Sequence, residues 1–236
     1  MTAWPKIWQI TRRLLYQNRW IYLLLMLWPA GMAAILLAPQ TRPEIEDVLS
    51  VLHQECLYGL ALVAFTGGAL LGNEQRSRRI VAVLSRAVGR RQYFLALLMA
   101  AWLPLFAYVL SFVMSGTFLL DAIDHPVPLL FALALVQLVL GMWTAAAALF
   151  FSTWLPMMLA STASLASLAL LGGVGYQWPN FTPGRLVVTL TQGDLRTTMK
   201  LVKNPSGLLL LIAGAAVLFA AGAAIFERHD LGLKSD

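Results

Sequence analysis

The sequence predicts an all-α integral membrane protein that crosses the membrane six times. Of its 236 residues, 59% are hydrophobic and only 12% are charged, whereas soluble globular domains carry about 25% charged residues. Six apolar runs each approach the roughly 20 residues that a helix needs to cross the hydrocarbon core. Basic residues gather in the segments between alternate runs, as in multi-pass membrane proteins. We therefore expect residues 1–236 to form a single transmembrane domain.

Residues 1–19 are predicted to form an amphipathic helix that lies in the membrane interface. Apolar side chains, including two tryptophans, recur there at helical spacing, and basic side chains occupy the other positions. Tryptophan on one face and cations on another are typical of an interfacial helix. The alternative is a plain cytoplasmic extension of the first span. With two arginines that precede the third span, the predicted membrane-interface anchors are Trp4, Trp8, Arg12, Arg13, Arg90 and Arg91.

The six predicted spans contain no charged residue or histidine. They cover residues 20–38, 56–71, 93–120, 128–151, 155–175 and 207–226. Because proton and ion relays depend on ionisable groups within the membrane, this absence argues against a secondary transporter driven by protons. Binding of sodium by backbone carbonyls needs no charged side chain and is left open.

The residues of an enzyme active site are missing as well. The histidines His53, His125 and His229 all fall outside the predicted spans, and Cys56 is the single cysteine, so no metal site is expected in the membrane. The chain has no glycine-rich phosphate loop ending in Lys-Ser or Lys-Thr. We predict no catalytic residue, no metal and no cofactor bound by this chain.

The charge distribution predicts a multi-pass protein of the plasma (cell inner) membrane with both termini in the cytoplasm. With this topology the cytoplasmic segments hold most of the 17 Lys and Arg residues, and the outer loops hold most of the 11 acidic residues. The net charge of +6 is then explained by membrane topology and anionic lipid, without nucleic acid as a partner. The exception is the basic extracytoplasmic loop 176–206, whose semi-apolar stretch 184–190 is predicted to be a re-entrant or interfacial helix.

Loop 72–92, between the second and third spans, is the most basic segment of the chain. It carries six arginines and one acid, Glu74. Asn73 is expected to begin a helix here, with Glu74 in its first turn and paired with Arg78 on an exposed face. An apolar strip formed by Ile80, Val83 and Leu84 fits a groove on another protein. The alternative is an ordinary basic loop that contacts only lipid.

The order of these elements resembles the membrane permeases of the type-2 ABC exporter family. That family has an amphipathic N-terminal helix, six spans, a cytoplasmic helix after span two and an outer excursion before span six. Glu74 matches a glutamate of the family's loop, and Arg90 matches the turn that opens span three. The ending from Phe226 to Leu231 resembles the family's usual exit. The sequence departs from the family's pattern at Arg78, Arg79, Ala87 and Gly89.

The resemblance implies a transmembrane permease subunit that works with a separate nucleotide-binding ATPase subunit, on which ATP and Mg are bound. It also implies a second permease chain, as a homodimer or a heterodimer, because six spans make half a pathway. Loop 72–92 then contains the coupling helix. The residues expected to contact the ATPase subunit are Glu74, Arg76, Arg78, Arg79, Ile80, Val83 and Leu84.

Two further expectations concern the cargo and the alternative function. A pathway lined by aliphatic and aromatic groups favours a lipid-like or amphipathic cargo. The alternative to transport is a membrane anchor or regulatory subunit of a larger complex, which would have the same loop without a continuous polar path through its spans.

Overall fold

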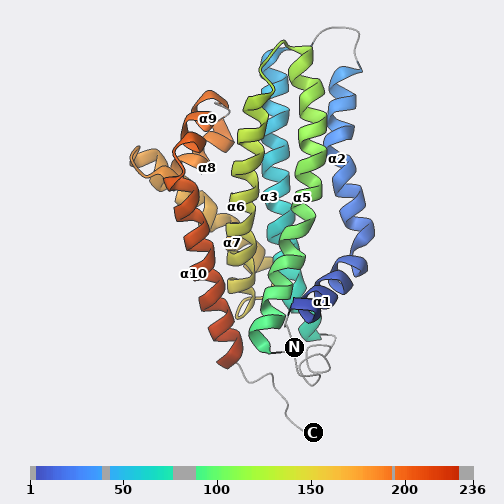
Figure 1. Cartoon of the computed structure of the whole chain (residues 1–236), viewed down its shortest axis with the longest axis vertical. Coiled ribbons are helices and arrows are strands. Elements are labelled where there is room, and N and C mark those ends of the chain that lie inside the picture. The colour runs from blue at the N-terminus through green and yellow to red at the C-terminus, as the bar shows by residue number, and fades with distance from the viewer. Residues whose placement is uncertain (1–3, 39–42, 77–88, 193–194, 229–236) are drawn as a thin grey trace.

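The computed structural model describes residues 4–38, 43–76, 89–192 and 195–228, and all regular secondary structure in these ranges is helical (Figure 1). The helices are α1 (Trp4–Gln17), α2 (Arg19–Leu37), α3 (Ile45–Arg76), α5 (Arg90–Ala122), α6 (Pro128–Ser152), α7 (Met157–Gln177), α8 (Thr182–Gln192), α9 (Leu195–Lys203) and α10 (Ser206–Arg228).

Five of these helices, α3, α5, α6, α7 and α10, are long and apolar enough to cross a membrane. The bent pair formed by α1 and α2 raises the number to six if it is counted as one span, and its two parts meet at an angle of 64°. The predicted all-α class is therefore confirmed, with five to six candidate spans and the composition of a multi-pass membrane protein.

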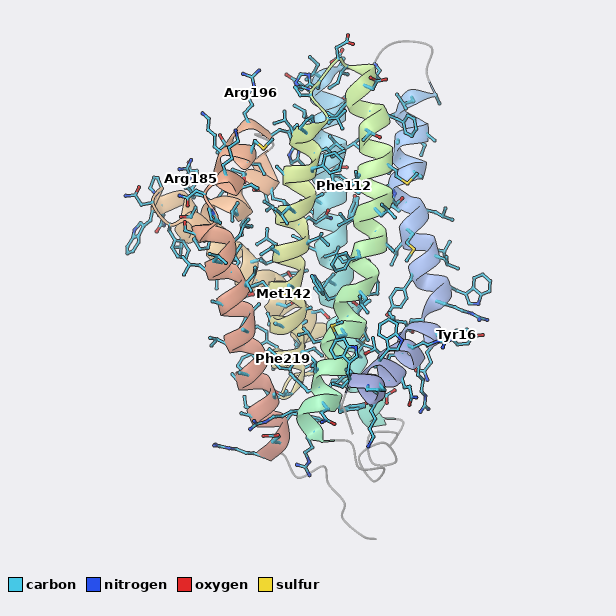
Figure 2. All side chains as sticks on the ribbon, in the orientation of Figure 1. Tyr16, Phe112, Met142, Arg185, Arg196 and Phe219 are labelled. Atoms are coloured by element: carbon cyan, nitrogen blue, oxygen red, sulfur yellow. The ribbon has the colours of Figure 1, made fainter. Side chains whose placement is uncertain are left out.

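The described ends of the chain lie at the same end of the bundle (Figure 1). Helix α1 lies there, α3 ends there at Arg76, α5 begins there at Arg90, and α10 ends there at Arg228. We call this the basal end. In Figure 2, Tyr16 lies toward the basal end, and Arg185 and Arg196 lie toward the opposite end. This arrangement agrees with an even number of crossings, while its orientation toward the cytoplasm stays a prediction.

Helix α1 turns away from α2 and packs against the start of α5. It buries Ile7, Thr11 and Leu14, and the Thr11 hydroxyl donates a hydrogen bond to the Ala96 carbonyl at 3.3 Å. Trp4 is 60% exposed. The amphipathic helix predicted for residues 1–19 is thus present from Trp4 to Gln17, and its position in the interface stays a prediction.

Helix α3 is much longer than the span predicted at 56–71. It begins at Ile45, so His53 and Glu55 lie inside a helix that is a candidate span. The expectation that ionisable residues are absent therefore holds for residues 56–71 as drawn but not for the whole candidate span. Apolar residues at helical spacing, with Val48 and Leu52 fully buried, extend the helix through a stretch whose acids lower its mean hydropathy.

The other end of α3 also differs from the prediction. The helix continues to Arg76, so Asn73 and Glu74 lie in its last turns, and the expectation that Asn73 begins a new helix is wrong. Gly72 is the only weak helix former just before them, and one glycine costs about 1 kcal/mol, too little to end a long packed helix.

The core of the bundle is formed by α3, α5 and α6, which lie side by side (Figure 1). Helix α5 runs unbroken through Pro104 and carries Phe112, which is fully buried in the middle of the bundle (Figure 2). Helix α2 packs on α5, and α10 packs on α6. A short turn joins α6 to α7, which agrees with the three residues left between the predicted spans 128–151 and 155–175.

The stretch predicted at 184–190 is helical and lies in α8, which packs against α7. The backbones of α7 and α8 meet at Gly175 and Gly184. They are so close that a Cβ added to Gly175 would lie 2.1 Å from the carbonyl carbon of Gly184. Helix α9 packs on α6 and buries Leu195, Thr198 and Leu201. Re-entry into the membrane stays a prediction for this segment.

Candidate functional site

The structure describes only part of the predicted coupling segment. Arg78, Arg79, Ile80, Val83 and Leu84 lie outside the described residues, so their contacts with an ATPase subunit stay predictions. Arg76 is the last residue of α3. Glu74, Arg90 and Arg91 are described, and they lie at the two points where the segment leaves α3 and enters α5.

Glu74 is joined to the first turn of α5. The hydroxyl of Tyr93 donates a hydrogen bond to Oε2 of Glu74 at 2.9 Å, and both side chains are buried. The exposed position expected for Glu74 is therefore wrong, since this face of α3 turns toward α5. A hydrogen bond to a charged group typically contributes about 1.5–3 kcal/mol. The pair thus ties the end of one candidate span to the beginning of the next.

The start of α5 is also tied to the end of α10. Tyr93 stacks on Phe226, with ring centroids 6.4 Å apart and an interplanar angle of 20°. The Arg91 guanidinium donates to a carboxylate oxygen of Glu227 at 2.8 Å, and Arg90 donates to the backbone carbonyl of Glu227. Arg90 and Arg91, which were predicted as interface anchors, therefore also contact the end of α10.

The predicted anchors at α1 have their charged and aromatic groups available for a membrane surface. Trp4 and Trp8 are 60% and 48% exposed, and Arg12 and Arg13 are exposed as well. Their exposure agrees with the predicted role, and the membrane contact itself stays a prediction.

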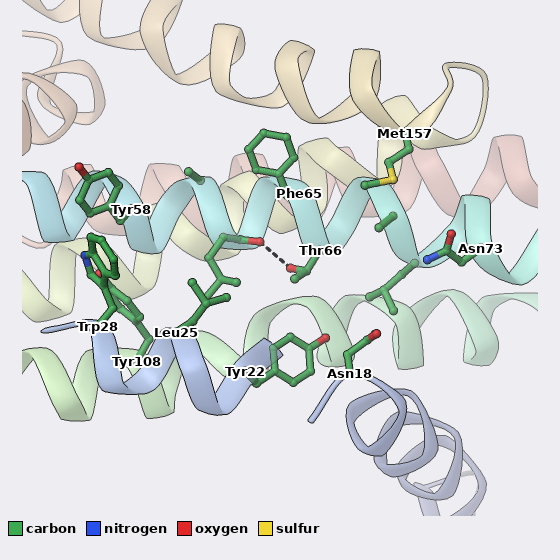
Figure 3. A pocket seen from close by; sticks show the side chains of 14 residues that line it. Asn18, Tyr22, Leu25, Trp28, Tyr58, Phe65, Thr66, Asn73, Tyr108 and Met157 are labelled. Atoms are coloured by element: carbon green, nitrogen blue, oxygen red, sulfur yellow. Dashed lines mark hydrogen bonds between the residues drawn. The ribbon is translucent and has the colours of Figure 1, made fainter. Parts of the chain in front are cut away.

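A side pocket of about 640 Å³ lies between α2 and α3, with contributions from α5 and α7. We call it the α2–α3 pocket. Figure 3 shows Trp28 and Tyr58 at one end and Asn18, Asn73 and Met157 at the other. Trp28 and Tyr58 are in edge-to-face contact, with ring centroids 5.8 Å apart. Volumes of about 300–1,000 Å³ are typical of pockets for small organic ligands.

The lining of the α2–α3 pocket is apolar along most of its length. Leu25 and Phe65 contribute to its walls (Figure 3). The Thr66 hydroxyl donates to the Leu62 carbonyl of its own helix at 2.8 Å, so it offers its lone pairs but not its proton. None of the described lining residues is charged. The pocket therefore suits a molecule with an apolar body and a polar group near the two asparagines.

The α2–α3 pocket and the end of α3, where the predicted coupling segment begins, are formed by residues that are adjacent in the chain. Asn73 lines the pocket, and the next residue, Glu74, is the one that Tyr93 binds. Helix α3 is continuous through both. A displacement of the end of α3 would therefore move one wall of the pocket.

In the part of the chain that the structure describes, no group of three or more His, Cys, Asp or Glu residues could hold a metal ion.

Sequence reasoning missed Tyr93 as the partner of Glu74 and Glu227 as the partner of Arg91. The sequence gives no sign of which side chains meet across helices.

Comparison with protein-family models, with curated proteins and with solved structures finds no match for this chain.

Proposed function

We propose that this chain is the transmembrane permease subunit of an ATP-driven exporter of the type-2 ABC class. It forms half of the substrate pathway and couples to a separate nucleotide-binding ATPase subunit, which binds ATP and Mg, through segment 72–92. The observation that carries the proposal is the continuity of α3, which lines the α2–α3 pocket with Asn73 and is tied to α5 through Glu74 and Tyr93.

The coupling follows from the stiffness of a packed helix. A push on segment 72–92 acts on the last turn of α3 and on the first turn of α5. Since the start of α5 is also packed against the end of α10 through Tyr93 and Phe226, the push moves three helix ends together. Helix α2 contributes the opposite wall of the pocket and buries few of its own side chains, among them Tyr22 and Ala33. Relative motion of α2 and α3 then opens or closes the pocket.

A second permease chain completes the pathway in this proposal, as a homodimer or a heterodimer. Large apolar side chains are exposed along α2 and α7, including Leu24, Leu27, Leu159 and Leu170. Such faces contact lipid or another chain in a membrane protein. The cargo is an amphipathic molecule, because the pocket offers aromatic and aliphatic walls with polar groups at one end.

The proposal is tested by purifying the tagged full-length chain from its native membrane in mild detergent. We expect an ATPase with a phosphate loop to co-purify, and we expect Ile80→Asp combined with Val83→Asp to lower its recovery at least tenfold. Ile45→Asp is the matched control, since Ile45 is exposed at the other end of α3. Full recovery of the ATPase with the double variant would contradict the proposed coupling segment.

The alternative is a non-transporting anchor or regulatory subunit. It is favoured by the dense packing of α3, α5 and α6, where side chains such as Leu105, Phe112 and Leu140 are fully buried. Reconstitution of the complex in vesicles separates the two functions. An exporter shows ATPase activity that rises with an amphipathic compound and falls back with Trp28→Ala, whereas an anchor shows no such response.

A further inference from the structure

The middle of the bundle contains a carboxyl group that the proposed coupling does not use. Glu55 lies on α3 and is fully buried. The Tyr108 hydroxyl of α5 donates to its backbone carbonyl at 2.9 Å. Along α3, Glu55 is 10 residues from Ile45 and 21 residues from Arg76, which is about 15 Å and 32 Å. Glu55 is therefore more than two helical turns from either end of α3.

The side chain of Glu55 has no hydrogen-bond partner among the described residues. Both carboxylate oxygens are buried and unpartnered, as are Oε1 of Gln137 and Nε2 of His53. The Gln137 amide donates instead to the Cys56 carbonyl at 3.3 Å. A group of unpartnered polar atoms inside an apolar bundle is unusual, because each such atom costs free energy.

The helices are packed closely at Gly59, which lies one turn from Glu55 along α3. A Cβ there would lie 2.3 Å from Nε2 of Gln137 and 3.0 Å from Cε1 of Tyr108. The carboxylate oxygens of Glu55 are themselves closed off from solvent, so an occupant of the Glu55 carboxyl is very small.

No permanent positive charge faces Glu55 from the helices that pack on α3. Helix α6 has no ionisable residue, and α7 has only Tyr176. Helix α5 offers Tyr108 at this level, and its arginines are at the basal end. The single cation of α8, Arg185, donates to the Pro179 carbonyl, and the cation of α2, Arg19, stacks on Tyr16 and Trp20. On α3 itself the neighbours are His53, Cys56 and Tyr58.

We propose that Glu55 is a proton-binding site inside the bundle, occupied as the neutral carboxylic acid while the bundle is closed. An ionised carboxylate without a cation is costly at this depth, and the proton is the smallest ligand that removes the charge. When a movement of α3 brings water to the site, the O–H bond breaks, the proton passes to water and the carboxylate remains. Closure reverses the step, with water as the donor of the returning proton.

This inference stands independently of the ATPase partner and is tested on the purified full-length chain. Dicyclohexylcarbodiimide is an apolar reagent that reacts with protonated carboxyl groups and leaves a stable N-acylurea. We expect mass spectrometry to find this adduct on Glu55 at neutral pH, with less of it at higher pH. The exposed residues Glu44 and Glu46 serve as the internal comparison and should react only with a water-soluble carbodiimide.

A variant of Glu55 and the addition of metal ions complete the test. Glu55→Gln has the shape of the neutral acid, so it should fold with unchanged elution in size-exclusion chromatography and lose the adduct. Addition of sodium or potassium should leave the labelling of Glu55 unchanged. Absence of the adduct on Glu55 in the folded wild-type chain would overturn the proton site, and protection by either metal ion would replace it with a metal-cation site.

Discussion

Two glutamates on the same helix, Glu55 and Glu74, are both buried but have opposite surroundings. They lie 19 residues apart in α3, about 28 Å along the axis. Glu74 accepts a hydrogen bond from Tyr93 at the basal end, whereas both carboxylate oxygens of Glu55 lack a partner among the described residues. Burial alone therefore does not define a role: the partnered glutamate holds helices together, and the unpartnered one is left to bind a small ligand.

The largest expected effect is a loss of stability from a larger side chain near Glu55, compared with a small gain from one near Glu74. Gly59→Val should destabilise the chain by about 3 kcal/mol, because its side chain would overlap the Gln137 amide and the Tyr108 ring. Gly72→Ala, two residues before Glu74, is the matched control, since nothing lies within 4 Å of its Cβ position. It should stabilise α3 by up to about 1 kcal/mol. Thermal unfolding in detergent, followed by circular dichroism, measures both changes, and equal melting temperatures would contradict this difference in packing.

The next largest effect is expected from loss of the hydrogen bond to Glu74. Tyr93→Phe removes the hydroxyl that donates to Glu74 and should cost about 2 kcal/mol, because the buried carboxylate loses a donor while the ring stacking on Phe226 is kept. Tyr58→Phe is the control, since Tyr58 is 46% exposed. The same unfolding measurement applies. A Tyr93→Phe protein as stable as the control would show that Glu74 does not depend on this bond.

The smallest effect is expected at the exposed ion pair. Arg91→Ala removes the contact with the Glu227 carboxylate, but the Arg91 side chain is 74% exposed, and water and salt screen such a pair. We expect a shift of the melting temperature close to the error of the measurement, and none in high salt. A large shift that persists in high salt would mean that Arg91 packs against α10 rather than pairing with it.

The sequence predicts the helical class well because long apolar runs have few alternatives in a membrane. The short turn between α6 and α7 and the helical stretch in α8 were also predictable, the first from the brief polar break at 152–154. The beginning of α3 was missed because Glu46, Asp47 and Glu55 lower the hydropathy of a stretch whose apolar residues still recur at helical spacing.

The contacts of the candidate site could not be predicted from the sequence in the same way. Tyr93 and Glu74 are 19 residues apart, and Arg91 and Glu227 are 136 residues apart. Hydropathy and helical periodicity show which face of a helix is apolar, but they do not show which residue of another helix it meets. The same limit hid the burial of Glu55, which contacts Tyr108 of α5 through its backbone carbonyl.

The glycine contact between α7 and α8 limits how the chain can move. Gly175 and Gly184 are in backbone contact, and one turn away Gly172 lies against Val187, with 3.1 Å between a Cβ built on Gly172 and Cγ1 of Val187, so the two helices are packed too closely to slide freely along each other. The two helices should therefore tilt as one stiff body. In the proposed exporter, force applied at the basal end would then reach the far surface as a rocking of this body, so that the two sides of the membrane open in alternation rather than together.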